Sequence, residues 1–265
     1  MNIAIIGTGK MGTAIAGGLV DQAIVDADEL CGADVSRQTR EAFAIATGAR
    51  VCADAAEAVR DADIVLLAVK PQVAAEVARQ VATACNGKLI LSIAAGIRID
   101  SLREWFGTAR VVRVMPNTPM MIGQGVAAFS CADGVSEVDR ATVRTIFEAV
   151  AIAREIPEAL MDAVTALSGS GPAYVFEFIQ AMVEAAAGLG MDADDALDLT
   201  AQTVVGAAQM VRSGCGSPEE LRDAVTSKGG TTAEGLRVLD EGDFRGLMQR
   251  VLQAAHDRSV ELGRE

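Results

Sequence analysis

Two glycine-rich segments have the residue types and spacing of anion-binding sites. The first, GTGKMG, directly follows the apolar run NIAII and leads into AIAGGLV. In a strand–GxGxxG–helix context the helix start offers free N–H groups and a positive dipole to a pyrophosphate. A glycine-rich turn without a ligand is the weaker alternative. We therefore predict a dinucleotide-binding loop formed by Gly7, Thr8, Gly9, Lys10, Met11 and Gly12.

The second segment, DAVTSKGGTTAEG, spans residues 223–235. Thr231 as N-cap and Glu234 reaching back would form a capping box that needs no ligand. That pattern leaves two glycines and Thr232 unexplained. Backbone N–H groups at such a helix start can hold a carboxylate. We predict a substrate site formed by Ser227, Gly229, Gly230, Thr231 and Thr232, with Thr232 as the candidate catalytic residue.

The sequence gives two conflicting indications of the nicotinamide cofactor. A predicted strand, residues 29–34, ends at Asp34, 22 residues after Gly12. An acid at this place accepts a hydrogen bond from a ribose 2′-OH and favours NAD. Ser36, Arg37 and Arg40 follow and could instead hold the 2′-phosphate of NADP. Solvated arginines in the first turn of a helix are an equally good interpretation of the last two.

Later apolar runs end in residues suited to a ligand. The predicted strand 64–69 ends before Lys70 and Pro71, the run KLILS before AAG, and ARVVRV before MPNTP. In a parallel sheet, ligands lie beyond the carboxyl ends of the strands. We expect the cofactor to contact Ala68, Val69, Lys70, Pro71, Ala94 and Asn117.

Strands alternate with helices up to about residue 155, which predicts an α/β fold with a Rossmann-type doubly wound sheet. Beyond Met161 only helices are predicted, after a small-residue loop at 168–171. We expect a dinucleotide-binding domain at 1–158 and an all-helical domain at 159–265. The helix that begins near Pro172 is strongly polar only at Glu177, Gln180 and Glu184. A domain of about 100 residues cannot bury such helices alone, so we expect a homodimer.

Composition excludes several classes of function. A net charge of −13 argues against nucleic-acid or anionic-membrane binding. The N-terminus lacks the basic region of a signal peptide, and the five cysteines form no C-x-x-C motif. We expect free thiols in the cytoplasm and no metal site. The single histidine, His256, makes a histidine base improbable.

Several motifs together resemble the pyrroline-5-carboxylate reductase family. They run in order along nearly the whole chain: GTGKMG (7–12), AVKPQ (68–72), SIAAGI (92–97), RVMPNTP (113–119), LSGSGPAY (167–174) and DAVTSKGGTTAEG (223–235). The first is shared with many dehydrogenases, whereas the last three in combination are specific. The chain departs from the family pattern at Lys228, where proline is frequent, and at Ala55, where an asparagine commonly contacts the adenosine ribose.

The resemblance implies reduction of 1-pyrroline-5-carboxylate to L-proline by NAD(P)H, with NADPH favoured. It also implies a helical dimerisation domain, a homodimer or larger ring of dimers, and a substrate carboxylate held by residues 227–232. The alternatives are another imine or β-hydroxyacid reductase and a non-catalytic NAD(P)-binding regulator. A β-hydroxyacid dehydrogenase would use a lysine of the helical domain, and the only one there, Lys228, lies in the glycine loop.

Overall fold

The computed structural model describes residues 1–263 and divides into two compact units. Unit 1 comprises residues 1–170 together with the chain from Ala255 onward, and unit 2 comprises Gly171–Ala254. The chain therefore passes between the units twice, at 170/171 and at 254/255. The domain boundary expected at 158/159 stays a prediction, because a division into compact units does not test where a functional domain begins.

Unit 1 is built on one eight-stranded sheet, with strand order β3-β2-β1-β4-β5-β6-β7-β8. The first six strands are parallel, whereas β7 is antiparallel to β6 and β8 is parallel to β7. The strands are β1 (Ile3–Ile6), β2 (Leu30–Ala33), β3 (Arg50–Cys52), β4 (Ile64–Leu67), β5 (Leu89–Ser92), β6 (Val111–Pro116), β7 (Gly125–Cys131) and β8 (Ala151–Glu155). Because β1 lies between β2 and β4, the strand order reverses beside it, which is where doubly wound sheets bind ligands.

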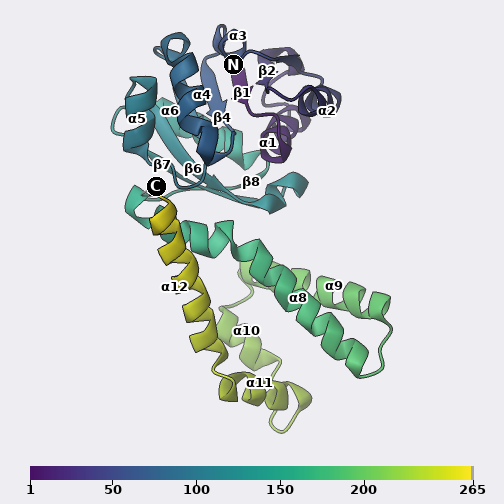
Figure 1. The fold of residues 1–265 in the computed structure, drawn as a ribbon. Helices are drawn as coiled ribbons and strands as arrows, with labels where there is room; N and C mark the ends of the chain where they lie inside the picture. The colour runs from purple at the N-terminus through teal and green to yellow at the C-terminus, as the bar shows by residue number, and fades with distance from the viewer. Residues whose placement is uncertain (264–265) are drawn as a thin grey trace. The chain divides into compact units, whose positions relative to one another are not determined.

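Helices connect successive strands and pack against the sheet (Figure 1). They are α1 (Lys10–Asp21), α2 (Arg37–Thr47), α3 (Ala55–Val59), α4 (Pro71–Val81), α5 (Ile99–Phe106) and α6 (Glu137–Glu148). In α4 the buried residues are Ala74, Ala78 and Val81, spaced by four and three, so one stripe of the helix faces the sheet. Buried side chains from strands and helices form one hydrophobic core. The α/β fold predicted from the sequence is confirmed.

The small-residue loop predicted at 168–171 is wrong. The chain there is helical: α7 (Met161–Val164) runs into one π-helical segment, Thr165–Gly169, and α8 begins at Gly171. Thr165 Oγ1 donates to the carbonyl of Met161 (2.8 Å), and Ser168 Oγ donates to that of Val164 (3.1 Å). These bonds let residues that usually favour loops remain within a helix. A π segment is rare and is frequently found at functional sites.

Unit 2 is entirely helical. It contains α8 (Gly171–Gly188), α9 (Ala193–Arg212), α10 (Pro218–Ala224), α11 (Thr231–Glu241) and the first part of α12 (Phe244–Leu262). The structure describes every residue of α8, and none of them is buried. Large apolar side chains on α8 are instead exposed: Val175, Phe176, Phe178 and Met182. In a single chain the apolar surface of α8 is therefore uncovered. This is the surface that led us to expect a homodimer. No helix within residues 1–263 is both long and apolar enough to cross a membrane.

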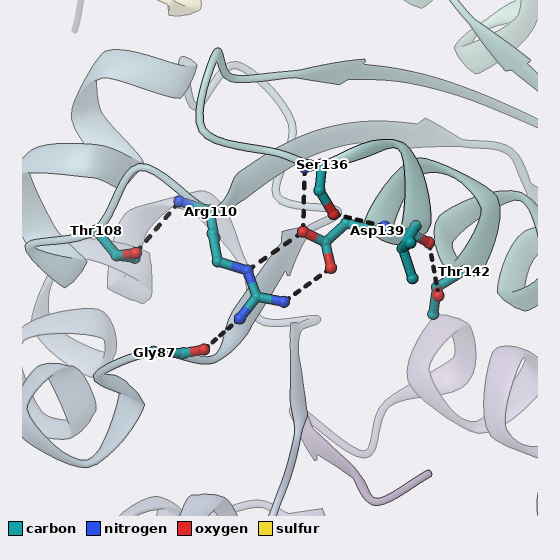
Figure 2. Close-up of polar contacts among 7 residues, drawn as sticks. Gly87, Thr108, Arg110, Ser136, Asp139 and Thr142 are labelled. Atoms are coloured by element: carbon teal, nitrogen blue, oxygen red, sulfur yellow. Dashed lines mark hydrogen bonds and ion pairs between the residues drawn. The ribbon is translucent and has the colours of Figure 1, made fainter.

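An ion pair between Arg110 and Asp139 joins the first turn of α6 to the residue that directly precedes β6 (Figure 2). Arg110 donates to both carboxylate oxygens, at 3.2 and 2.7 Å, and to the carbonyl of Gly87. Ser136 caps α6 and completes a capping box with Asp139. Burial by itself raises the pKa of Asp139, but hydrogen bonds from Arg110 and Ser136 outweigh it and the net pKa is lowered.

This pair makes a pH-dependent contribution to stability. A carboxyl whose folded-state pKa is lowered stabilises the fold above its unfolded pKa, and this contribution disappears as pH falls through the folded value. Arg110→Met should lower the free energy of unfolding by about 1–2 kcal/mol at neutral pH, because the pair is only partly buried. Urea unfolding of both proteins should show this difference shrinking toward about pH 3. A difference that stays constant over that range would contradict the assignment.

Candidate functional site

The turn between β1 and α1 is fixed by close backbone contacts. Gly7 has φ of +103°, and a Cβ there would lie 2.5 Å from the carbonyl oxygen of Ala68. A Cβ on Gly12 would lie 2.2 Å from the carbonyl oxygen of Gly7. A Cβ on Gly9 would meet nothing within 4 Å. The fold itself therefore requires glycine at positions 7 and 12, whereas position 9 borders open space that a ligand can use.

The start of α1 offers unused hydrogen-bond donors. Gly9 is the N-cap and supplies no side-chain acceptor, so the first-turn N–H groups of Lys10 and Met11 remain without a side-chain cap. The Oγ1 of Thr8, a residue only 3% exposed, has no hydrogen-bond partner. A cavity of about 380 Å³ opens here, lined by Thr8, Gly9, Lys10, Thr13, Ala14, Thr39, Ala42 and Met121. This donor set fits the pyrophosphate of a dinucleotide.

Asp34 holds the glycine-rich loop in place. It follows β2, which ends at Ala33, and its Oδ2 accepts the backbone N–H of Thr8 at 3.0 Å. Its Oδ1 accepts the N–H of Ser36 at 2.9 Å. Each carboxylate oxygen thus already receives one donor, while further lone pairs remain for a ribose hydroxyl. Supporting the loop is a role that the sequence did not reveal, because it depends on the pairing of β1 with β2.

The polar residues after Asp34 differ in their surroundings. Ser36 is the N-cap of α2 and accepts the N–H of Thr39. Arg37 pairs with Glu41 at 2.7 Å, and 84% of its side chain is exposed. Arg40 Nη1 instead donates to two carbonyls of the preceding loop, those of Asp34 and Val35. Arg40 is therefore the arginine held against this loop, and a 2′-phosphate contact from Ser36 or Arg37 stays a prediction.

The strands end within two residues of the places that the sequence predicts. β4 ends at Leu67 and not at Val69, because the neighbouring strand β1 turns away at Gly7. The last bond between the two segments runs from Ala68 N to the carbonyl of Ile6 (2.7 Å). Lys70 is the N-cap of α4, and Pro71 is its first residue. Ala94, which follows β5, is buried, and its N–H bonds to Ser92 Oγ.

Asn117 uses both ends of its amide within the protein. Its Oδ1 accepts the N–H of Val126 at 2.8 Å, and its Nδ2 donates to the carbonyl of Ser168 at 3.1 Å. The side chain is buried and joins the end of β6 to β7 and to the π segment. Sequence reasoning found the residue but missed this role. A contact from Asn117 to the cofactor stays a prediction.

The capping box at Thr231, which was the ligand-free alternative for this segment, does not form. Gly230 is the N-cap of α11, without a side-chain cap, and Glu234 pairs with Arg237 instead (3.1 Å). The reason is the turn: Gly229 has φ of +72° and the Gly230 N–H bonds to the carbonyl of Ser227, so the helix starts one residue early. The first N–H groups of α11 consequently lack a side-chain acceptor. That arrangement favours an anion-binding site over a simple turn.

The substrate-loop residues lie together at this helix start. A Cβ on Gly230 would lie 2.4 Å from Ser227 Oγ, so the serine hydroxyl sits directly beside the glycine. Thr231 and Thr232 form the first turn of α11. These residues belong to unit 2, whereas every residue predicted to contact the cofactor belongs to unit 1.

The doubly wound sheet and the uncapped glycine-loop helix define a dinucleotide-binding protein of the Rossmann class. Comparison with known families narrows this class. Residues 2–96 match the family model described as NADP oxidoreductase, coenzyme F420-dependent. Residues 158–262 match the model described as pyrroline-5-carboxylate reductase dimerisation.

Full-length relatives identify the family. The pyrroline-5-carboxylate reductase of Pseudomonas aeruginosa is 42% identical over 99% of this chain and 97% of its own length. That of Arabidopsis thaliana is 39% identical over 98% and 95%. A solved pyrroline-5-carboxylate reductase from Coxiella burnetii is 34% identical, with a TM-score of 0.93 and 98% of each chain covered. The chain belongs to the pyrroline-5-carboxylate reductase family, and the resemblance seen in the sequence is confirmed.

The glycine-rich loop yields a test that separates binding from folding. Gly9→Ala should leave the unfolding midpoint unchanged, since the new methyl group enters open space. It should weaken NADPH binding about tenfold or more, because we expect that space to receive the pyrophosphate. Gly12→Ala is the matched control and should destabilise the fold by about 1–3 kcal/mol through overpacking. Calorimetric titration with NADPH and thermal unfolding measure the two effects. Unchanged NADPH affinity in Gly9→Ala would remove this loop from the cofactor site.

Proposed function

We propose that this protein reduces 1-pyrroline-5-carboxylate to L-proline with NADPH, the last step of proline biosynthesis. The observation that carries the proposal is full-length similarity to pyrroline-5-carboxylate reductases, at 42% identity to that of Pseudomonas aeruginosa. The NADP oxidoreductase model over residues 2–96 supports the cofactor. So does a Plasmodium falciparum pyrroline carboxylate reductase with NADP bound, 32% identical with a TM-score of 0.90 and 98% of that chain covered.

The cofactor is held by unit 1. The N–H groups that begin α1 and the unpartnered hydroxyl of Thr8 bind its pyrophosphate. Ser36 and Arg37 follow β2 and bind at the ribose, where Asp34 supports the loop. The residues after β4 and β5, and Asn117 after β6, line its path along the carboxyl ends of the strands. When bound, NADPH supplies the hydride.

The substrate carboxylate is held by the start of α11. Free N–H groups at Thr231 and Thr232 and the hydroxyl of Ser227 suit a carboxylate, and the helix dipole adds to the attraction. A cyclic imine is basic and can be protonated in water before it binds, so the chain need not supply the proton when the hydride adds to the carbon. Thr232 orients the ring nitrogen by a hydrogen bond, directly or through water. Orientation of two bound reactants can supply about 7–11 kcal/mol of the rate enhancement.

Assembly and location are part of the proposal. The dimerisation model over residues 158–262 and the exposed apolar side chains of α8 support a homodimer. A ring of such dimers is the larger assembly that we propose alongside it. The five cysteines are free, as expected of a protein of the reducing cytoplasm. A small-molecule substrate, and not a nucleic acid or membrane, is the partner that the net charge of −13 favours.

The deciding experiment is an assay of the purified protein with 1-pyrroline-5-carboxylate and each nicotinamide in turn. We expect oxidation of NADPH, followed by its absorbance, together with formation of proline. A higher kcat/KM with NADPH than with NADH would support the 2′-phosphate contacts. Absence of turnover with both cofactors would overturn the proposed function.

The role of Thr232 can be separated from that of its neighbours. Thr232→Ala should lower kcat/KM by about 10- to 100-fold, the equivalent of one hydrogen bond to a charged group, without changing NADPH affinity. Thr232→Ser should retain most of the activity, since it keeps the hydroxyl. Thr226→Ala is the matched control, because the Thr226 hydroxyl bonds to the carbonyl of Arg222 in the last turn of α10. Equal kcat/KM for Thr232→Ala and the control would exclude Thr232 from the substrate site.

A further inference from the structure

The segment that follows β6 brings a methionine to the cavity at the start of α1. Residues Thr118–Ile122 form a 3-10 helix. Its residue Met121 lines the cavity of about 380 Å³ together with the glycine-rich loop. No motif of the sequence predicts this contact, because the two segments are distant along the chain. Both segments belong to unit 1.

The position of Met121 is fixed by its neighbour Met120. Met120 is 1% exposed and packs so closely on the start of β7 that Gly125 has no room for a Cβ. Its N–H bonds to the carbonyl of Asn117 at 3.2 Å. Successive side chains of a 3-10 helix point about 120° apart, since the helix has three residues per turn. Burial of Met120 therefore turns the side chain of Met121 outward, where it is 53% exposed.

The cavity has a polar wall and an apolar wall. Thr8 Oγ1 and the first N–H groups of α1 form the polar wall, which suits a pyrophosphate. Met121, Ala14 and Ala42 supply apolar groups. An apolar side chain over a bound anion excludes water and strengthens the hydrogen bonds beneath it, because the local dielectric is lowered. An unbranched thioether suits this task, since it adapts its shape to the ligand.

The same exposure makes the sulfur of Met121 accessible to oxidants. Among the methionines that the structure describes, Met121 has the highest exposure. Hydrogen peroxide oxidises a thioether by transfer of one oxygen atom. The O–O bond breaks, an S=O bond forms as sulfur loses two electrons, and the second oxygen leaves as water. The product is a polar sulfoxide, which disrupts apolar contacts.

We propose that Met121 covers the dinucleotide bound at the start of α1, and that oxidation of its thioether by a peroxide lowers the affinity of this site for NADPH. The inference rests on the proposed function, because it assumes that NADPH occupies this cavity. It adds a binding residue and a modification site to unit 1 and involves no residue of unit 2. Methionine sulfoxide reductases reverse this oxidation, so their action on the oxidised protein should restore the affinity.

Oxidation of the full-length protein by hydrogen peroxide tests the contact directly. The rate of oxidation of each methionine is measured by peptide mass spectrometry, with and without saturating NADPH. NADPH should slow the oxidation of Met121 about fivefold or more, because the bound cofactor covers the sulfur. Met191 and Met210, which are 44% and 47% exposed and belong to unit 2, serve as references whose rates should not change. The proposal is overturned if NADPH slows Met121 no more than these references.

Three variants separate the polarity of this side chain from its presence. Met121→Gln introduces a permanent polar group and should lower NADPH affinity about 3- to 10-fold in calorimetric titration. Met121→Leu keeps an apolar side chain of similar volume and should bind NADPH within about twofold of the wild type. Ile122→Gln is the matched control, since Ile122 is a neighbouring apolar residue, 77% exposed, that is not among the residues lining the cavity. Its NADPH affinity should equal that of the wild type.

Peroxide treatment of these proteins decides whether Met121 carries the effect. We expect peroxide to lower the NADPH affinity of the wild type and of Ile122→Gln, but not that of Met121→Leu. An equal loss in Met121→Leu would assign the effect to other oxidisable residues, such as the free cysteines, and overturn the proposal. Equal affinities of Met121→Gln and Ile122→Gln before treatment would overturn it as well.

These measurements need no imine, so they are independent of turnover. If the wild type binds NADPH but does not reduce 1-pyrroline-5-carboxylate, the proposed function fails, while the oxidation and binding experiments still decide the role of Met121. If the wild type does not bind NADPH, both proposals are overturned.

Discussion

The close approach of three backbone segments at Gly7 is the constraint on which the rest of unit 1 depends. Gly12 lies against the carbonyl of Gly7, and Gly7 lies against that of Ala68, so no side chain fits between α1, β1 and β4. This contact presses the start of α1 onto the point where the strand order reverses. The free N–H groups of the helix consequently point at the place where a doubly wound sheet binds its ligand. Asp34 then fixes the loop from the side of β2.

The two units share one structural feature, which we propose binds a different anion in each. In each, a glycine serves as N-cap, supplies no side-chain acceptor and leaves the first N–H groups of a helix available. A serine, threonine or aspartate cap would satisfy those groups internally and remove the site. Local backbone donors of this kind explain how a chain with a net charge of −13 can bind a dinucleotide and a carboxylate. Long-range charge governs macromolecular partners, whereas a helix start acts over a single turn.

Much of the fold follows from local patterns. The alternation of short apolar runs with amphipathic helices predicts the sheet, and a local capping box at Ser136 starts α6. The predictions that failed depended on contacts distant in sequence. Residues 168–169 form part of a π segment because β6 holds that segment through Asn117 and Met115. Thr231 is not the N-cap of α11, because the preceding glycine turn starts the helix one residue earlier, with Gly230 as the N-cap.

The sequence by itself determined the class of the fold, the two anion-binding motifs and the family, because each is encoded in a short run of residues whose physics is local. Only the tertiary structure decided what Asp34, Asn117 and Arg113 contact, since their partners lie 26, 51 and 45 residues away. The alternation of Arg113, Met115 and Asn117 indicates one face of a strand, but it does not predict which segment packs on that face. Which distant segments meet depends on how the strands and helices pack into the core, and the local preferences of the chain do not specify this packing.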